Sequence, residues 1–172
     1  MIFLIKKIRC EISFILSNIY VIVIFSFLTS LGGVLLWVNG GSVWFIMQSS
    51  KNPNNISLSA VFVLSLVIYA MMGAVVSIVL KTENHICRGK NALTAIVLTM
   101  AMYILSLSWY AVFFCTRMSL FSAILLMIVV ILGVLLFFTV KKRLIILGIL
   151  VLLIEFAEIY LLYVNISFCL LN

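Results

Sequence analysis

Two glutamates stand three residues apart near the middle of a long apolar run. Glu155 and Glu158 fall between Leu144 and Leu171, and a spacing of three puts both side chains on one face of a helix. A charged acid at the centre of a bilayer costs about 3 kcal/mol on insertion scales. No Lys or Arg lies within any apolar run of the chain to pair with them. We therefore expect at least one carboxyl to be protonated near neutral pH and to donate a hydrogen bond.

Three roles for these carboxyls remain open. They are a proton or cation site in a small transporter, a contact to the polar edge of a ligand, or a neutral carboxyl bonded to Ser106, Ser108 or a tyrosine of a neighbouring helix. No nucleophile paired with a base and no glycine-rich phosphate loop occurs in the chain, so a binding protein is expected rather than an enzyme.

Polar and aromatic side chains recur at helical spacing in three of the runs. Asn165 extends the glutamate stripe, and polar groups lose free energy in hydrocarbon, so each stripe should face inward. If the stripes line one chamber, its aromatic walls suit a flat, largely apolar ligand. The alternative is pairwise hydrogen bonding between helices, which the serines alone favour. The candidate ligand-binding residues on these stripes are Ser65, Tyr69, Tyr103, Ser106, Trp109 (or its neighbour Tyr110), Phe113, Glu155 and Glu158.

Five charge-poor stretches of about 20 residues or more must position these side chains. Each is long enough to cross a bilayer as a helix, and none shows the alternation of a barrel strand. The sequence predicts an all-α membrane protein, a five-helix transmembrane bundle that forms one domain over residues 1–172. The predicted spans are 12–37, 56–80, 92–115, 119–140 and 144–171. The fourth span is almost entirely apolar, so we expect a scaffold without chemistry.

The net charge of +7 would suggest nucleic acid in a soluble protein, but here it marks cytoplasmic loops. Three basic residues precede the first span, three separate spans two and three, and three separate spans four and five. We expect the N-terminus and loops two and four in the cytoplasm, with the C-terminus on the other side. An outer membrane would permit the inverse. His85 is expected in a cytoplasmic loop, and no metal site is expected.

The loop after the first span contains both turn residues and an apolar segment. Asn39-Gly40-Gly41 favours a turn, and residues 44–47 (Trp-Phe-Ile-Met) are too apolar for a free linker. We expect this piece to fold back over one mouth of the bundle. Equally, Trp44 could belong to an aromatic belt at the membrane interface. In the second span, Gly73 and Ser77 form a small-x-x-x-small pair that could join helices.

The third span carries the most specific motif. Residues 105–114 read LSLSWYAVFF, which resembles the L-N-x-x-W-x-x-x-F-F of the TspO/MBR family, the translocator proteins or tryptophan-rich sensory proteins. Residues 68–73 (IYAMMG) are similar to the family's L-Y-x-x-M-G, and Trp44-Phe45 before Lys51-Asn52-Pro53 is similar to its first-loop motif. Phe156-Ala157 matches the F-A of its last span. Ser65 stands where the family has tryptophan, so the chain resembles a remote member.

The resemblance implies a five-helix bundle, often a homodimer, that binds porphyrins, haem-like tetrapyrroles or other flat lipophiles beneath the first loop, with no required cofactor. It also implies a bacterial cell membrane and a transport or sensory role. Porphyrin breakdown, reported for some relatives, is a further alternative. The ligand-binding residues that the motifs carry over are Trp44, Tyr69, Ser106, Trp109, Phe113, Phe156 and Ala157.

Overall fold

The computed structural model describes residues 12, 19–38, 40–50, 57–85, 90–140 and 145–170, and the described part of the chain is helical with short turns. The fold class predicted from the sequence is confirmed. The elements are α2 (Ile19–Val38), α3 (Gly41–Ser49), α4 (Leu58–His85), α5 (Lys90–Tyr110), the π-helix η1 (Ala111–Thr116), α6 (Ser119–Val140) and α7 (Ile145–Cys169).

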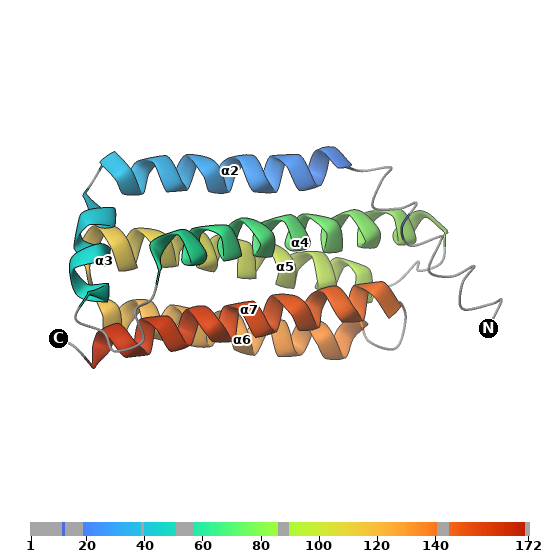
Figure 1. The fold of residues 1–172 in the computed structure, drawn as a ribbon. Coiled ribbons are helices and arrows are strands. Elements are labelled where there is room, and N and C mark those ends of the chain that lie inside the picture. The colour runs from blue at the N-terminus through green and yellow to red at the C-terminus, as the bar shows by residue number, and fades with distance from the viewer. Residues whose placement is uncertain are drawn as a thin grey trace.

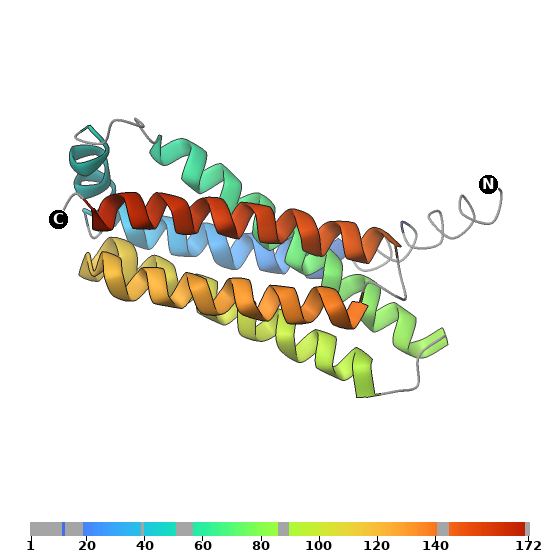
Figure 2. The ribbon, with the colours of Figure 1, turned by 90° about the horizontal axis from the view of Figure 1, so that it is seen from below.

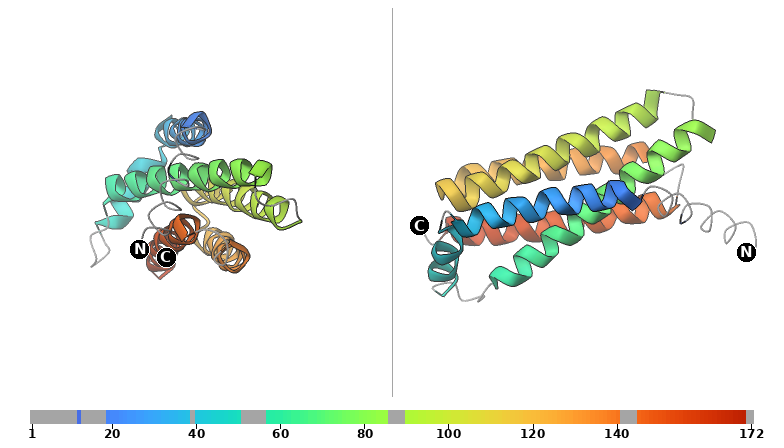
Figure 3. Two further views of the ribbon diagram at one scale, coloured as in Figure 1. Left: turned by 90° about the vertical axis from the view of Figure 1, so that its right-hand side faces the viewer. Right: turned by 90° about the horizontal axis from the view of Figure 1, so that it is seen from above.

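The long helices lie roughly along one direction in three layers (Figure 1). Helix α4 contacts α2 on one side and α5 and α7 on the other, and α6 packs between α5 and α7. An end-on view shows α2 outside this group, against α4, while α4 crosses the bundle obliquely (Figure 3). The core that α4 to α7 enclose is therefore where inward-facing side chains meet.

Within the part of the chain that the structure describes, four helices are long and apolar enough to cross a membrane: 58–80 within α4, 93–116 through α5 and η1, α6, and α7. Helix α2 adds a fifth apolar helix. Large apolar side chains cover the outside, as at Phe121, Ile131 and Phe138 on α6, which are 56–59% exposed. Water would penalise such a surface, whereas lipid accepts it. The chain is an integral, multi-pass membrane protein.

The predicted spans agree closely with the helices, with differences at their ends. The fourth span is matched residue for residue by α6. Helix α4 continues past Leu80 to His85, so His85 ends a helix instead of lying in a loop, contrary to the expectation above. In the first predicted span, the structure describes Ile12 and then the helix from Ile19 onward. Residues 56, 144 and 171 were also predicted to lie in spans, and they fall outside the described residues.

Gly73 brings α2 and α4 unusually close together. A Cβ at this position would lie 2.8 Å from the Ile22 Cα and 3.3 Å from the Val21 carbonyl oxygen. Only a residue without a side chain permits this approach of two backbones. Gly73, one of the small residues that could join helices, lies at a contact between two helices of one chain.

Helix α3 crosses one end of the bundle, at the same end as the C-terminal end of α7 (Figure 2). Gly40, with φ of 68°, supplies the left-handed turn that separates it from α2. Phe45 is completely buried, while Ile46 and Met47 are 58% and 63% exposed. The predicted fold-back of the loop over one mouth of the bundle is confirmed.

Candidate functional site

Six aromatic rings gather beneath and within α3. The Phe45 ring stacks on Phe168 with centroids 4.8 Å apart and on Phe114 at 5.7 Å. The Trp109 ring stacks on Phe113 at 5.3 Å and 15°. The edge of Trp44 meets Phe113 at 5.4 Å. We call this set the aromatic cluster: Trp44, Phe45, Trp109, Phe113, Phe114 and Phe168.

Four rings from the end of α5 and from η1 lie on one inward side. Residues 109, 110, 113 and 114 are spaced i, i+1, i+4 and i+5, and this spacing gives one broad face of a helix. Trp109 and Tyr110 are both buried, at 0% and 6% exposure, and so are Phe113 and Phe114. The sequence left Trp109 and Tyr110 as alternatives for the inward face, and the structure places both there.

A second aromatic group continues the cluster toward the middle of the bundle. Tyr110 stacks on Phe114 at 5.8 Å and tilts toward Tyr69 at 6.4 Å. Tyr69 meets Tyr103 edge-on at 5.3 Å, and Tyr103 contacts Phe25 of α2 at 4.5 Å. The predicted stripes of α4 and α5 therefore converge, and their inward orientation is confirmed.

The stripes meet in a close-packed core. Trp109 and Phe113 have no exposed surface, so neither borders a space large enough for water. The open chamber expected from the sequence is not found among the described residues, because rings from α3, α5 and α7 fill this space. Ser65 and Thr99 bond to carbonyls of their own helices, at 2.7 Å and 2.8 Å, and do not bridge helices through these bonds.

The two glutamates face different neighbours. Ser106 Oγ of α5 donates a 2.7 Å hydrogen bond to Glu158 Oε1, which is one of the contacts predicted for a neutral carboxyl. Glu155 instead lies against Gly133 of α6, and a Cβ there would overlap its carboxyl group. Both glutamates are buried, at 7% and 0% exposure. Among the described residues, neither Glu155 oxygen nor Glu158 Oε2 has a hydrogen-bond partner.

Asn165 ties three helices together near the aromatic cluster. The surrounding donors and acceptors orient its amide so that the oxygen accepts from Trp109 Nε1 at 2.8 Å, while the nitrogen donates to the Ser119 carbonyl at 3.0 Å. Ser122 Oγ also bonds to this amide. The Trp109 indole, which the sequence assigns to a ligand, thus has a structural partner as well.

The fourth span is more than an inert scaffold. Its helix, α6, supplies the gap at Gly133 for Glu155 and the Ser119 and Ser122 groups for Asn165. The sequence assigned this helix no chemistry, and the contacts seen here are hydrogen bonds and packing. The small and hydroxyl residues that interrupt its apolar run were the available signal.

Most of the predicted site residues come together, and two do not. Trp44, Trp109 and Phe113 belong to the aromatic cluster. Phe156, in contrast, is 70% exposed on the outside of α7. It lines an outer groove of about 490 Å³ with Ala157 and residues of α4 and α7, namely Ala60, Leu64, Leu153 and Tyr160. The remaining predicted residues, Ser65, Tyr69, Tyr103, Ser106, Glu155 and Glu158, are buried in the core.

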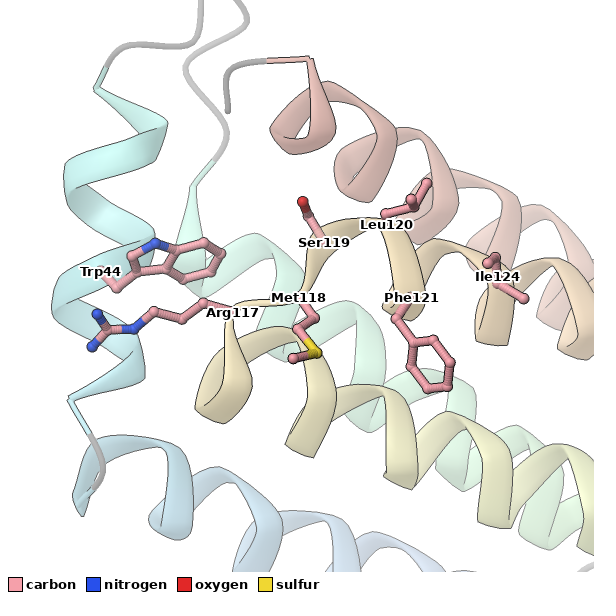
Figure 4. Close-up of a pocket in the computed structure, with 7 residues that line it drawn as sticks. All are labelled: Trp44, Arg117, Met118, Ser119, Leu120, Phe121 and Ile124. Atoms are coloured by element: carbon pink, nitrogen blue, oxygen red, sulfur yellow. The ribbon is translucent and has the colours of Figure 1, made fainter.

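A second groove opens beside α3. It has a volume of about 550 Å³, and Trp44 and Arg117 lie at one end while apolar residues of α6 continue from it (Figure 4). Trp44 is the member of the aromatic cluster that reaches this surface. No sequence pattern indicates this groove, because α3 and the start of α6 are far apart along the chain.

Comparison with family models, with curated proteins and with solved structures yields no match to this chain.

Proposed function

We propose that this membrane protein binds a flat lipophilic ligand in the aromatic cluster and that the ligand enters beneath α3. The observation that supports this most directly is the buried position of the Phe45 ring. One short helix at the end of the bundle places this completely buried ring among Phe113, Phe114 and Phe168. A flat ligand that took the place of Phe45 would stack on the same rings.

Helix α3 is suited to move away from the rings that surround Phe45. Gly40 gives the chain a flexible joint before it, and the outer face of α3 is exposed at Val43, Ile46 and Met47. Displacement of α3 withdraws Phe45 and Trp44 together and leaves Trp109 and Phe113 as one wall of a slot. Offset stacking on such rings contributes about 0.5–1.5 kcal/mol per aromatic pair beyond the burial of area.

Tetrapyrroles are the first ligand class to test. The motif through which the chain resembles the TspO/MBR family includes Trp109 and Phe113, which are central to the aromatic cluster. A porphyrin is flat and largely apolar, and its acidic edge could remain at the surface beside Trp44 and Arg117.

A reversible cross-link between α3 and η1 tests the proposal. A Cβ at Gly41 would lie 3.0 Å from the Phe114 Cβ, shorter than the roughly 3.5–4.5 Å of a disulfide, so a small outward shift of α3 would bring the two positions into range. The test variant combines Gly41→Cys and Phe114→Cys with serine at positions 10, 87, 115 and 169. Protoporphyrin binding to purified protein is followed by quenching of tryptophan fluorescence.

The reduced variant should bind protoporphyrin. Oxidation should lower the association rate or the affinity for protoporphyrin at least tenfold, and a reductant should restore it. The same background with Gly41→Cys alone serves as the control and should not respond to oxidation. Equal binding by the oxidised and reduced double variant would contradict entry beneath α3. A lack of quenching in the wild-type protein would contradict the tetrapyrrole.

A second candidate function is proton-coupled transport through Glu155 and Glu158. The observation that favours it is that three of their four carboxylate oxygens have no hydrogen-bond partner among the described residues, although both side chains are buried within α7. Such groups in a membrane span are typical of proton relays. Proteoliposomes should acidify in response to an imposed potential, and Glu155→Gln should abolish this flux. An absence of flux in the wild type would exclude this function.

A further inference from the structure

We propose that the groove between α3 and α6 binds an anionic phospholipid, with the phosphate at Arg117 and one acyl chain along α6. This site adjoins the aromatic cluster at Trp44, but lipid binding there does not depend on the function proposed above. Its lining residues are Trp44, Arg117, Met118, Ser119, Leu120, Phe121 and Ile124.

The charged end of the groove lies at the depth of lipid headgroups. Arg117 stands in the turn between two membrane-spanning segments, which end at Thr116 and begin at Ser119. This position corresponds to the boundary between hydrocarbon and water. Trp44 lies beside it at the same end of the groove (Figure 4), and tryptophan prefers this interfacial depth.

Arg117 is available to an external anion. Its side chain is exposed, and no ion pair joins it to an acidic residue of the described part of the chain. Of the four acidic residues in the sequence, Glu155 and Glu158 are buried within α7, and Glu83 lies in the last turn of α4, at the other end of the bundle. The fourth, Glu11, lies outside the described residues. A guanidinium group binds phosphate oxygens through two parallel hydrogen bonds.

The rest of the groove matches an acyl chain. Leu120, Phe121 and Ile124 are 71%, 56% and 46% exposed, and they extend from Arg117 along the outside of α6 toward the middle of the membrane (Figure 4). A free phosphate ion would not contact these apolar side chains. A phospholipid can contact Arg117 through its phosphate and the apolar side chains through an acyl chain. It therefore complements the groove in both charge and shape.

Net charge should determine which phospholipid is preferred. Phosphatidylcholine carries a cation next to its phosphate, whereas phosphatidylglycerol does not. One interfacial basic residue contributes about 1 kcal/mol toward anionic lipid, which corresponds to roughly a fivefold preference. We therefore expect phosphatidylglycerol to be retained about fivefold better than phosphatidylcholine at this groove.

Native mass spectrometry of the purified protein with equimolar phosphatidylglycerol and phosphatidylcholine measures this preference. Arg117→Asn should abolish it, and Arg117→Lys should retain most of it. Asparagine is chosen because Arg117 has φ of 60°, a left-handed conformation that asparagine tolerates. The matched control is Lys90→Gln, which removes a charge at the start of α5, at the far end of the helix, and should leave the preference unchanged.

Phe121→Ala tests the apolar wall without touching the charge. It should reduce the number of bound phosphatidylglycerol molecules but leave the protein folded, because the side chain is half exposed. Added inorganic phosphate should not displace the lipid. The proposal is overturned if Arg117→Asn keeps the fivefold preference, if Lys90→Gln loses it equally, or if phosphate alone competes.

Discussion

At the scale of single residues, the glutamates of α7 show how a membrane bundle accommodates two acids without a basic partner. Glu158 accepts a hydrogen bond from Ser106 of α5, and Glu155 occupies the space that Gly133 leaves in α6. The two carboxyls therefore make contacts with different helices. Their removal should have separable effects, which a matched set of substitutions can measure.

The first prediction concerns Gly133. Gly133→Ala places a Cβ where the Glu155 carboxyl lies, and overpacking of this kind costs about 1–3 kcal/mol. Thermal unfolding in detergent should show the loss. Adding Glu155→Ala should restore much of it, because the shorter side chain clears the space. Additive losses in the double variant would show that the two residues are not in contact.

The second prediction concerns Ser106 and Glu158. Ser106→Ala removes the donor of a buried hydrogen bond and should cost about 1–3 kcal/mol, because a polar acceptor is left unsatisfied. Ser106→Ala combined with Glu158→Met should be more stable than Ser106→Ala alone, since both partners are then apolar. A double variant that unfolds at a lower temperature than the single one would contradict this explanation.

Sequence reasoning succeeded for residues whose own helix determines their direction. Ser106, Trp109 and Glu158 were predicted to face inward from helical spacing, and all three are buried. It could not pair Glu155 with Gly133, because the pairing depends on how α6 and α7 are aligned. For Phe156, the family motif carried over a residue that lies on the outside of α7.

At the scale of elements, close contacts between backbones set the positions of α2 and α3. Gly73 allows α4 to approach α2, and Gly41 lets the start of α3 rest on Phe114 of η1. Sequence periodicity predicts the length and inward face of a helix, but a contact between two backbones needs the tertiary arrangement. The π-turn of η1 is similarly absent from a pattern read with a period of 3.6 residues.

The third prediction concerns the joint between α2 and α4. Gly73→Ala would bring a Cβ against the backbone of Ile22, which cannot rotate aside, so the helices must separate. We expect a loss of about 1–3 kcal/mol in thermal unfolding. Gly32→Ala in α2 is the matched control, because no atom lies within 4 Å of its added Cβ. It should stabilise the helix by about 0.5–1 kcal/mol, and equal losses would contradict a specific role of Gly73.

At the scale of the whole molecule, the distribution of side chains is that of a bundle surrounded by lipid. Polar side chains such as Ser65, Ser106, Glu158 and Asn165 lie inside, and large apolar side chains cover the described outer faces. Composition alone predicted this, because 67% of the residues are hydrophobic and the charges fall between the spans. The side of the membrane on which each end lies depends on those charges and stays a prediction.

The last prediction tests whether the outer surface of α6 faces lipid or water. Ile131 is 58% exposed near the middle of α6. In water, Ile131→Lys would change stability by no more than about 0.5 kcal/mol. In a bilayer it places a charge in hydrocarbon, at a cost of about 2.5–3.5 kcal/mol on insertion scales. The variant should therefore insert poorly, as measured by carbonate extraction of membranes and by the yield of monodisperse protein.

Met118→Lys provides the matched control for this test. Met118 is 59% exposed, like Ile131, but it lies in the turn before α6 beside Arg117. A lysine there remains at the headgroup level, where its ammonium group is hydrated, so insertion should be normal. Because the exposed fraction and the introduced lysine are matched at the two positions, we attribute a large difference between them to depth. Equal yields would mean that the middle of α6 does not face hydrocarbon.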